Sequence, residues 1–493
     1  MHDPPRVDSH SSSSSSIAPR IFLLLWLLAF IPRFLLALVF LRNPIALDDM
    51  FQYDMLARSI VEGRGYRWYT RADVAQLEGY LSQFVDLEKI TVPEDGLLTT
   101  FRGPGYPLFL SGLYRFVSYE DRFALTRLAQ AALTALLAPL VAALALRMKM
   151  SRRTATLAGV GMGLYPILLF YPVGLASENT FILLLVLTFI ALIGAQQSKK
   201  RSPLIFAGIL MGLTMLTRSI LAPFMLFGAL WYWRFAGHKR RGVITLMIIA
   251  FGITLPWALR NTQIMGKPTF VETSMGFNLF VGYHPKGDGS FLSEVAIIPI
   301  TILDDAERDR FALDSAKQFI LDDPLQALWR IVRRSAFFFG VEDREISYFY
   351  NNNFLGFIAQ PWLTVLYILL ITPWILVGIF APLGLILTSD RKATWLALGL
   401  IAAYSVPHLL ILADSRFHLT LVPILLPFAA YGWVHRQKSF RLILGGSSSS
   451  PKIWLARITL LTIIILWVWG FLMNYSKLLR LLGPEGNTLF LPY

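Results

Sequence analysis

The feature that most constrains this chain is a series of apolar stretches that recurs from residue 17 to residue 473. Each is about 20 residues long, which is enough for an α-helix to cross the hydrocarbon core of a bilayer. Backbone polar groups in lipid must be hydrogen-bonded within the protein, so repeated stretches of this kind favour a helix bundle. Charged residues make up only 15% of the chain. The sequence therefore predicts an all-α polytopic membrane protein.

The apolar stretches divide the chain into one transmembrane domain with two tails. Residues 1–16 are rich in serine and predict a disordered cytoplasmic tail, residues 17–473 form the transmembrane domain, and residues 474–493 form an external tail. We predict about 11 spans, at residues 17–41, 121–146, 154–170, 180–195, 203–216, 221–232, 243–257, 361–387, 395–412, 419–433 and 454–473.

The charges between the spans predict the topology. The short polar breaks hold 17 basic residues and one acidic residue, whereas the two long breaks, 42–103 and 259–353, hold 17 basic and 23 acidic residues. Basic loops stay in the cytoplasm, so both long loops are expected outside a plasma (inner) membrane, with the N-terminus inside. The net charge of +14 is thus explained by topology, and a nucleic-acid partner is not expected.

The first long loop opens on two adjacent carboxylates, Asp48 and Asp49. Tyr53 follows Asp49 by four residues and shares one face of a short helix with it, and glycines at 63 and 65 are expected to end that helix. Two neighbouring carboxylates that are partly withdrawn from water are expected to have raised pKa values, which suits a general base. The simpler reading is that they cap the helix.

Other elements of the loops are expected to lie along the membrane. A short apolar helix follows RGPGYPLFL, and an amphipathic helix is predicted near residues 314–339. Within the first span, Arg33 is expected to extend to the interface, the alternative being that it faces the protein interior. These membrane-lying helices could flank a groove for a lipid chain.

The predicted topology collects further ionisable residues on the outer side. They are Arg102, Glu178, Arg218, Arg260 and Arg416. Arginines near the membrane boundary could stabilise a leaving phosphate, and the carboxylates could deprotonate an acceptor hydroxyl. The alternative is that Glu178 caps a helix and that the arginines anchor span ends in the interface.

Several kinds of chemistry are not indicated. The chain has no phosphate-binding GxxxxGK[ST] loop, no zinc-binding HExxH motif and no cysteine. His284 and His418 are scattered, as surface histidines are, so no metal site is predicted, although a divalent metal is not excluded by sequence. No cofactor is expected.

The chain resembles the GT-C superfamily of membrane glycosyltransferases, in the branch of protein O-mannosyltransferases and lipid A aminoarabinose transferases. The motifs that carry this resemblance are RGPGYPLFL, ASEN, LTRS, PWALRN, SMGFNLFVGYHP and SRFHLTLVP, together with the first-loop helix. Aligning Tyr53 and Ala57 with the DExxY…A pattern of that branch places Asp49 at its catalytic aspartate. Met50 stands where the branch has glutamate, and Asp48 supplies a second acid, so both aspartates are candidates for the base.

The resemblance implies a bundle of about 11 helices and transfer of a sugar from a polyprenyl-phosphate carrier to an acceptor hydroxyl outside, with inversion. Arg102 then corresponds to a basic residue near the donor phosphate, and we extend this role to Arg260 and Arg416. Glu178, Arg218 and Tyr53 complete the candidate site. Partners are the bilayer, the carrier and a glycan, lipid or protein acceptor. Alternatives are a transporter or lipid flippase, an O-antigen ligase or polymerase, and a non-catalytic scaffold.

Overall fold

The computed structural model describes residues 18–45, 48–82, 92–237, 239–342, 346, 350, 356–444 and 450–483. The predicted tail at 1–16 and the second half of the predicted tail at 474–493 lie outside these residues. The described part is almost entirely helical, and its one sheet pairs two-residue strands, β1 (Arg67–Trp68) and β2 (Leu97–Leu98), in antiparallel fashion.

The long apolar helices coincide with the predicted spans. They are α1 (Pro19–Val39), α6 (Arg122–Ala135) with α7 (Leu137–Arg147), α8 (Arg152–Gly163) with α9 (Pro166–Phe170), α10 (Glu178–Gln197), α11 (Ser202–Thr217), α12 (Ala222–Phe235), α13 (Lys239–Met265), α19 (Trp362–Leu387), α20 (Arg391–Leu410), α21 (Val422–Val434) and α23 (Pro451–Leu482). Among the described residues, seven helices are long and apolar enough to cross a membrane, or eight if the pair bent by 54° around α8 and α9 is one span. The other predicted spans fall on the shorter helices α11, α12 and α21.

The spans form a bundle whose central and peripheral helices differ in burial. In the most apolar part of α10, 67% of the residues are buried, against 22% for α1 and α13 and 17% for α23. The peripheral helices therefore present their apolar side chains to lipid. Small residues let central helices approach closely: a Cβ on Gly384 of α19 would lie 1.9 Å from the carbonyl oxygen of Phe428 in α21.

Arg33 corrects one sequence prediction. We expected it to extend to the interface, but its side chain is buried and Nη1 donates to the carbonyl oxygens of Ala29 (2.9 Å) and Gly163 (2.7 Å). A guanidinium that faces neighbouring helices avoids the cost of exposure to lipid. Arg33 thus joins α1 to the bend after α8.

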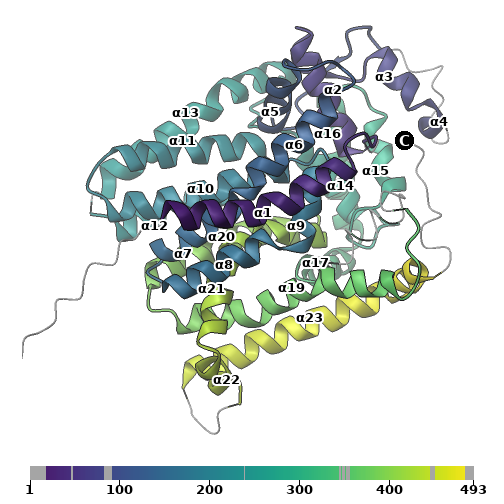
Figure 1. Ribbon diagram of the computed structural model, residues 1–493. Coiled ribbons are helices and arrows are strands. Elements are labelled where there is room, and N and C mark those ends of the chain that lie inside the picture. The colour runs from purple at the N-terminus through teal and green to yellow at the C-terminus, as the bar shows by residue number, and fades with distance from the viewer. Residues whose placement is uncertain are drawn as a thin grey trace, which may run out of the picture.

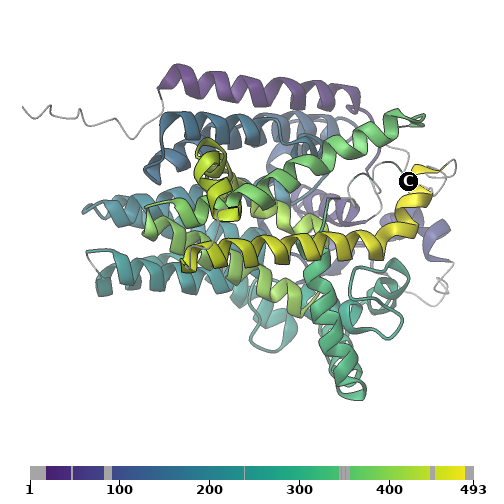
Figure 2. The same cartoon turned by 90° about the horizontal axis from the view of Figure 1, so that it is seen from below.

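The remaining helices come from the two long loops and gather at one end of the bundle, opposite α22 (Arg436–Leu444) (Figures 1 and 2). The first loop supplies α2 (Asp49–Val61), α3 (Arg71–Gln76), α4 (Glu78–Leu81) and α5 (Gly105–Tyr114), and the second supplies α14 (Ser274–Tyr283), α15 (Ser293–Ile300), α16 (Asp305–Asp322) and α17 (Pro324–Phe338). Short 3-10 helices are η2 (Tyr171–Val173), η3 (Ser219–Leu221) and η4 (Ser415–Thr420).

The second loop differs from its prediction in one place. The amphipathic stretch at 314–339 is not a single helix, because α16 ends at Asp322 and α17 starts at Pro324. Asp323 accepts a hydrogen bond from the backbone N–H of Gln326 (2.9 Å) and so caps the second helix. Proline at the first helical position suits such a start.

The two long loops pack directly on each other. The Asp305 carboxylate at the start of α16 accepts hydrogen bonds from the hydroxyls of Thr99 (2.9 Å) and Thr100 (3.0 Å), and the N–H of Thr273 donates to the carbonyl of Thr100 (3.0 Å). These contacts fix the 99–103 segment against the second loop. The last span also extends beyond its predicted end, because α23 continues through Leu482.

Candidate active site

The site is built on α2, whose start and end agree with the sequence. Asp48 is the N-cap, and its carboxylate accepts a hydrogen bond from the N–H of Met50 (2.9 Å). Gly63 follows the helix with φ of +77°, a conformation that favours glycine, and Gly65 has φ of +81°. Asp49 is therefore the first residue of the helix and points its side chain from the N-terminal turn.

A buried ionic network holds α2 in place. The Asp54 carboxylate accepts hydrogen bonds from Arg58 on the same helix (2.8 Å), from Arg122 at the start of α6 (2.8 Å) and from the hydroxyl of Tyr114 in α5 (2.9 Å). Arg58 also pairs with Asp73 of α3 at 2.6 Å. The carboxylates of Asp54 and Asp73 are almost completely buried. The network therefore joins α2, α3 and α5 of the first loop to α6 of the bundle.

Two arginines from distant parts of the chain meet at Asp49. Arg102 donates from Nη2 to one carboxylate oxygen of Asp49, and from Nε to the side-chain oxygen of Gln52 (2.9 Å). Arg416 of η4 places Nη2 3.8 Å from the other carboxylate oxygen. The Asp49 side chain remains 36% exposed, so a ligand can still reach it. One carboxylate thus bridges two guanidinium groups.

A second ion pair joins α10 and α11 beside this cluster. Glu178, at the start of α10, accepts a hydrogen bond from Arg218 at the end of α11 (2.9 Å). The Tyr53 hydroxyl donates to the Ser177 hydroxyl at 3.2 Å, which connects α2 with this pair. Arg102 stacks over the Tyr53 ring, with 5.5 Å between the guanidinium carbon and the ring centroid. The sequence named all these residues except Ser177 as site candidates.

One cavity of about 290 Å³ is lined by Asp49, Tyr53, Arg102, Arg218 and Arg416. The predicted site residue Glu178 is not part of this lining and is connected to the cavity through its ion pair with Arg218. The polar lining of the cavity includes Asp49, Arg102, Arg218, Glu272, Asn278 and Arg416. Its apolar lining includes Ile220, Pro223, Met275 and Ile411, and the Met275 side chain is exposed at its edge. The cavity combines three guanidinium groups, the two carboxylates of Asp49 and Glu272, and an apolar side, which together suit a lipid phosphate.

The charges around Asp49 reverse the expected direction of its pKa shift. Burial acts to raise the pKa of the Asp49 carboxyl, but the positive charges of Arg102, Arg416 and Arg218 outweigh burial and hold this pKa below its usual value. Burial acts to lower the pKa of Arg102 and Arg416, yet their carboxylate neighbours keep both above the usual arginine value. Asp49 is therefore ionised and paired with these arginines. The expectation of a raised pKa is not met.

Asp48 and Asp49 occupy different environments. Asp48 is exposed and caps α2, whereas Asp49 lines the cavity. The simpler reading of helix capping therefore applies to Asp48. Of the two candidate bases, Asp49 has the geometry for contact with a ligand.

Arg260 lies outside the cavity lining and contacts the backbone behind it. Its guanidinium donates to the carbonyls of Thr99 (2.9 Å) and Tyr66 (3.2 Å), and the Tyr66 hydroxyl in turn donates to the carbonyl of Arg102 (3.0 Å). We therefore replace the donor-phosphate role expected for Arg260 with a positioning role. It supports the segment that presents Arg102.

The structure adds residues that sequence reasoning missed. His408, near the end of α20, lines the cavity, stacks on Phe417 at 4.2 Å and has a buried Nε2 without a hydrogen-bond partner among the described residues. Glu272 also lines the cavity and accepts a hydrogen bond from the Ser219 hydroxyl (2.6 Å). A histidine within an apolar span was the signal for His408, because polar residues in spans are costly and often functional.

The histidines considered for metal binding lie apart from this cavity. His418 is completely buried, not a surface residue as expected: Nδ1 lies 2.6 Å from the carbonyl oxygen of Phe338, and Nε2 lies 3.1 Å from the Glu342 carboxylate. His284 is on α14's C-terminal side and only partly buried. Within the described residues there is no cluster of three acidic, histidine or cysteine side chains suited to a metal.

The fold and the cavity define a polytopic membrane protein with two carboxylates and three guanidinium groups in a cavity at the end where its two long loops meet. No protein-family model and no curated protein matches the chain.

Solved structures similar to this chain include the oligosaccharyltransferase AglB of Archaeoglobus fulgidus with an inhibitory peptide and dolichol-phosphate (14% identity, TM-score 0.44), covering 92% of this chain and 55% of that one. Another is the apo form of the Archaeoglobus fulgidus oligosaccharyltransferase (14% identity, TM-score 0.41), where the match covers 94% of this chain and 58% of that one. A third is ArnT of Cupriavidus metallidurans bound to undecaprenyl phosphate (11% identity, TM-score 0.37), where the match covers 94% of this chain and 91% of ArnT. The chain thus spans just over half of the oligosaccharyltransferase chains. The function proposed below rests on the cavity and not on these similarities.

Proposed function

We propose that the protein is a GT-C-type glycosyltransferase that moves a sugar from a polyprenyl-phosphate carrier to an acceptor hydroxyl on the extracytoplasmic side of the plasma membrane. The observation that supports this most is the bridge from Asp49 to Arg102 and Arg416 in a cavity with an apolar side. The guanidinium groups match a phosphate, and the carboxylate matches an acceptor proton.

The chemical step uses these groups as follows. The acceptor oxygen forms a bond to the anomeric carbon while the bond from that carbon to the phosphate oxygen breaks, and its electron pair leaves with the phosphate. Arg102, Arg416 and Arg218 stabilise the negative charge that develops on the leaving phosphate. Asp49 takes the acceptor proton. Attack opposite the leaving group inverts the anomeric centre.

Donor binding would also prepare the base. The guanidinium groups that hold Asp49 lower its pKa and so weaken it as a base. A donor phosphate competes for the same guanidinium groups and adds negative charge nearby, and both effects raise the pKa of Asp49. The carboxylate thus becomes a stronger base when a donor is present.

The cavity gives no support to the rival functions. Transporter sites are expected near the bilayer midplane, whereas this cavity lies at the end of the bundle where the loops gather. A metal-dependent variant is also not indicated, since Asp49 already faces three positive charges, which disfavour a divalent cation. An O-antigen ligase type of enzyme would not depend on Asp49.

The donor-phosphate role can be tested by native mass spectrometry of the detergent-extracted protein with added polyprenyl phosphate. Arg416→Met is expected to reduce carrier binding about tenfold, as loss of a charge-assisted hydrogen bond would. Arg115→Met, at an exposed arginine after α5, is the matched control and should bind normally. Equal binding by both variants would contradict the phosphate site.

A further inference from the structure

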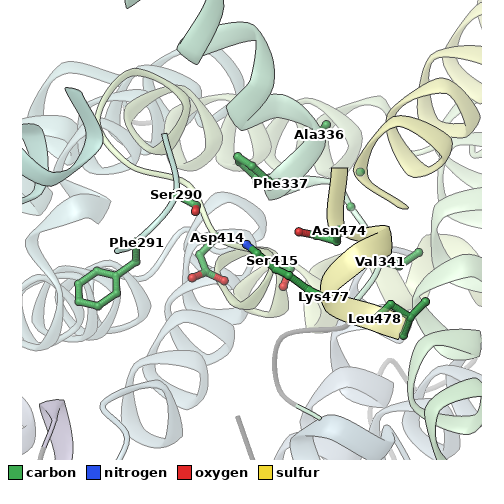
Figure 3. Close-up of a pocket in the computed structure, with 12 residues that line it drawn as sticks. Ser290, Phe291, Ala336, Phe337, Val341, Asp414, Ser415, Asn474, Lys477 and Leu478 are labelled. Carbon is green, nitrogen blue, oxygen red and sulfur yellow. The ribbon is translucent and has the colours of Figure 1, made fainter. Parts of the chain in front are cut away.

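A second cavity of about 160 Å³ adjoins the first (Figure 3). Phe291 lines both cavities, and Asp414 and Ser415 in the second immediately precede Arg416 in the first. The second cavity is closed by α17 on one side and by α23 on the other, through Asn474 and Lys477. It has no part in the chemistry proposed above.

The polar groups of this cavity are of mixed kind. Asp414 carries acceptors only, Lys477 carries donors only, and Asn474 and Ser415 carry both. In Figure 3 the side chains of Asp414, Asn474 and Lys477 extend toward the same space. Ser415 is 7% exposed, and its hydroxyl is buried without a hydrogen-bond partner among the described residues.

The combination of hydrogen-bond donors and acceptors in this cavity limits which ligands could bind there. A simple anion would be repelled by Asp414 and a simple cation by Lys477, and a hydrocarbon chain would leave the polar groups without partners. Sugar hydroxyls both donate and accept, so they suit all four side chains. Phe291 and Phe337 supply apolar surface for the C–H face of a sugar ring.

We propose that this cavity is a subsite for one sugar ring, next to the reacting centre. Only the origin of this ring depends on the proposed glycosyltransferase function. If that function holds, the ring belongs either to the sugar of the donor or to a glycan acceptor. The shared wall at Phe291 and residues 414–416 places the ring beside the Asp49 cavity.

Sugar binding can be tested without any assumption about catalysis. Methyl glycosides of glucose, galactose, mannose and arabinose are titrated against the full-length protein in detergent, with saturation-transfer NMR as the readout. At least one is expected to bind, and Asn474→Ala and Lys477→Met should weaken it about fivefold, as loss of one hydrogen bond does. Arg480→Met, one turn further along α23 and exposed, is the control for Lys477→Met and should bind as the wild type does.

Kinetics then identify the source of the ring. If Asn474→Ala and Lys477→Met raise the KM for the glycosylated carrier, measured by its hydrolysis without acceptor, the subsite belongs to the donor's sugar. A raised KM for the acceptor alone assigns it to an acceptor glycan. Binding of no glycoside, or equal binding by Asn474→Ala, Lys477→Met and Arg480→Met, would overturn the subsite. Glycoside binding in a protein that fails to bind polyprenyl phosphate would leave the subsite in place and overturn the proposed function.

Discussion

At the scale of single residues, charge decides what Asp49 can do. Its carboxylate lies beside Arg102 and 3.8 Å from Arg416, and this positive surrounding lowers its pKa despite burial. An isolated buried carboxyl would shift in the opposite direction. In the proposed reaction the arginines bind the donor phosphate, and until it is bound they hold the pKa of Asp49 low.

This restraint predicts a change in pH dependence. Asp49 must be ionised to act, so the acidic limb of kcat/KM against pH follows its pKa in the free enzyme. Arg416→Met removes a charge that stabilises the Asp49 carboxylate, so the pKa of Asp49 should rise and the acidic limb should move to higher pH. The pH profile of sugar transfer measures this shift. An acidic limb that stays in place, or moves to lower pH, would show that Arg416 does not act on the base.

The sequence identified part of this residue pattern. Helical spacing and the glycines at 63 and 65 placed Asp49 and Tyr53 on one face of a short helix that the structure contains. The sign of the pKa shift was not accessible, because Arg102 and Arg416 approach Asp49 only through tertiary packing. The burial of Arg33 likewise depends on tertiary packing, because its hydrogen-bond partner Gly163 lies on another helix.

At the scale of elements, α2 depends on the buried Asp54 network for its position. Arg58 and Arg122 reach the same carboxylate, so its removal would leave two guanidinium groups with fewer partners in a buried place. Such losses are costly because the remaining charge has no water to solvate it. The network therefore connects the stability of the first loop with the geometry of the cavity.

Asp54→Asn is accordingly expected to destabilise the protein by about 3 kcal/mol and to lower sugar transfer by moving α2. Thermal unfolding in detergent provides the measurement. Asp121→Asn is the control, since the Asp121 side chain is exposed and its carboxylate accepts a hydrogen bond from the hydroxyl of nearby Ser118 (2.9 Å). Unchanged unfolding temperatures for Asp54→Asn would mean that the network does not hold the helix.

Element boundaries were predictable where local signals are strong. The glycines after α2 marked its end, and every predicted span coincides with a helix. The break between α16 and α17 was missed although Asp323 and Pro324 form a cap signal, because the amphipathic pattern continues across them. His418 was misjudged because its burial depends on Glu342 and Trp374 from distant segments.

At the scale of the whole molecule, the two long loops and the cavity share one end of the bundle, with the basic helix α22 at the other. The charge distribution predicts that the cavity end is extracytoplasmic. Since the chain has no cysteine, single introduced cysteines report topology without background.

Glu94→Cys, in the first loop, and Lys438→Cys, in α22, provide the pair for this test. A membrane-impermeant maleimide added to intact cells is expected to label the cysteine at 94 and to label the cysteine at 438 only after permeabilisation. The reversed pattern would place the cavity in the cytoplasm. The proposed reaction would then require its donor and its acceptor on the cytoplasmic side.

The central claim is that Asp49, and not its neighbour Asp48, is the base in an arginine-lined donor site. Its most direct test compares Asp49→Asn and Asp48→Asn for sugar transfer from a polyprenyl-phosphate donor and for binding of polyprenyl phosphate. Asp49→Asn is expected to lower the transfer rate at least about a hundredfold while binding the carrier as well as the wild type, because the competing carboxylate is removed. Asp48→Asn should retain most activity, since an amide still accepts the capping hydrogen bond. Full transfer by Asp49→Asn would contradict the account.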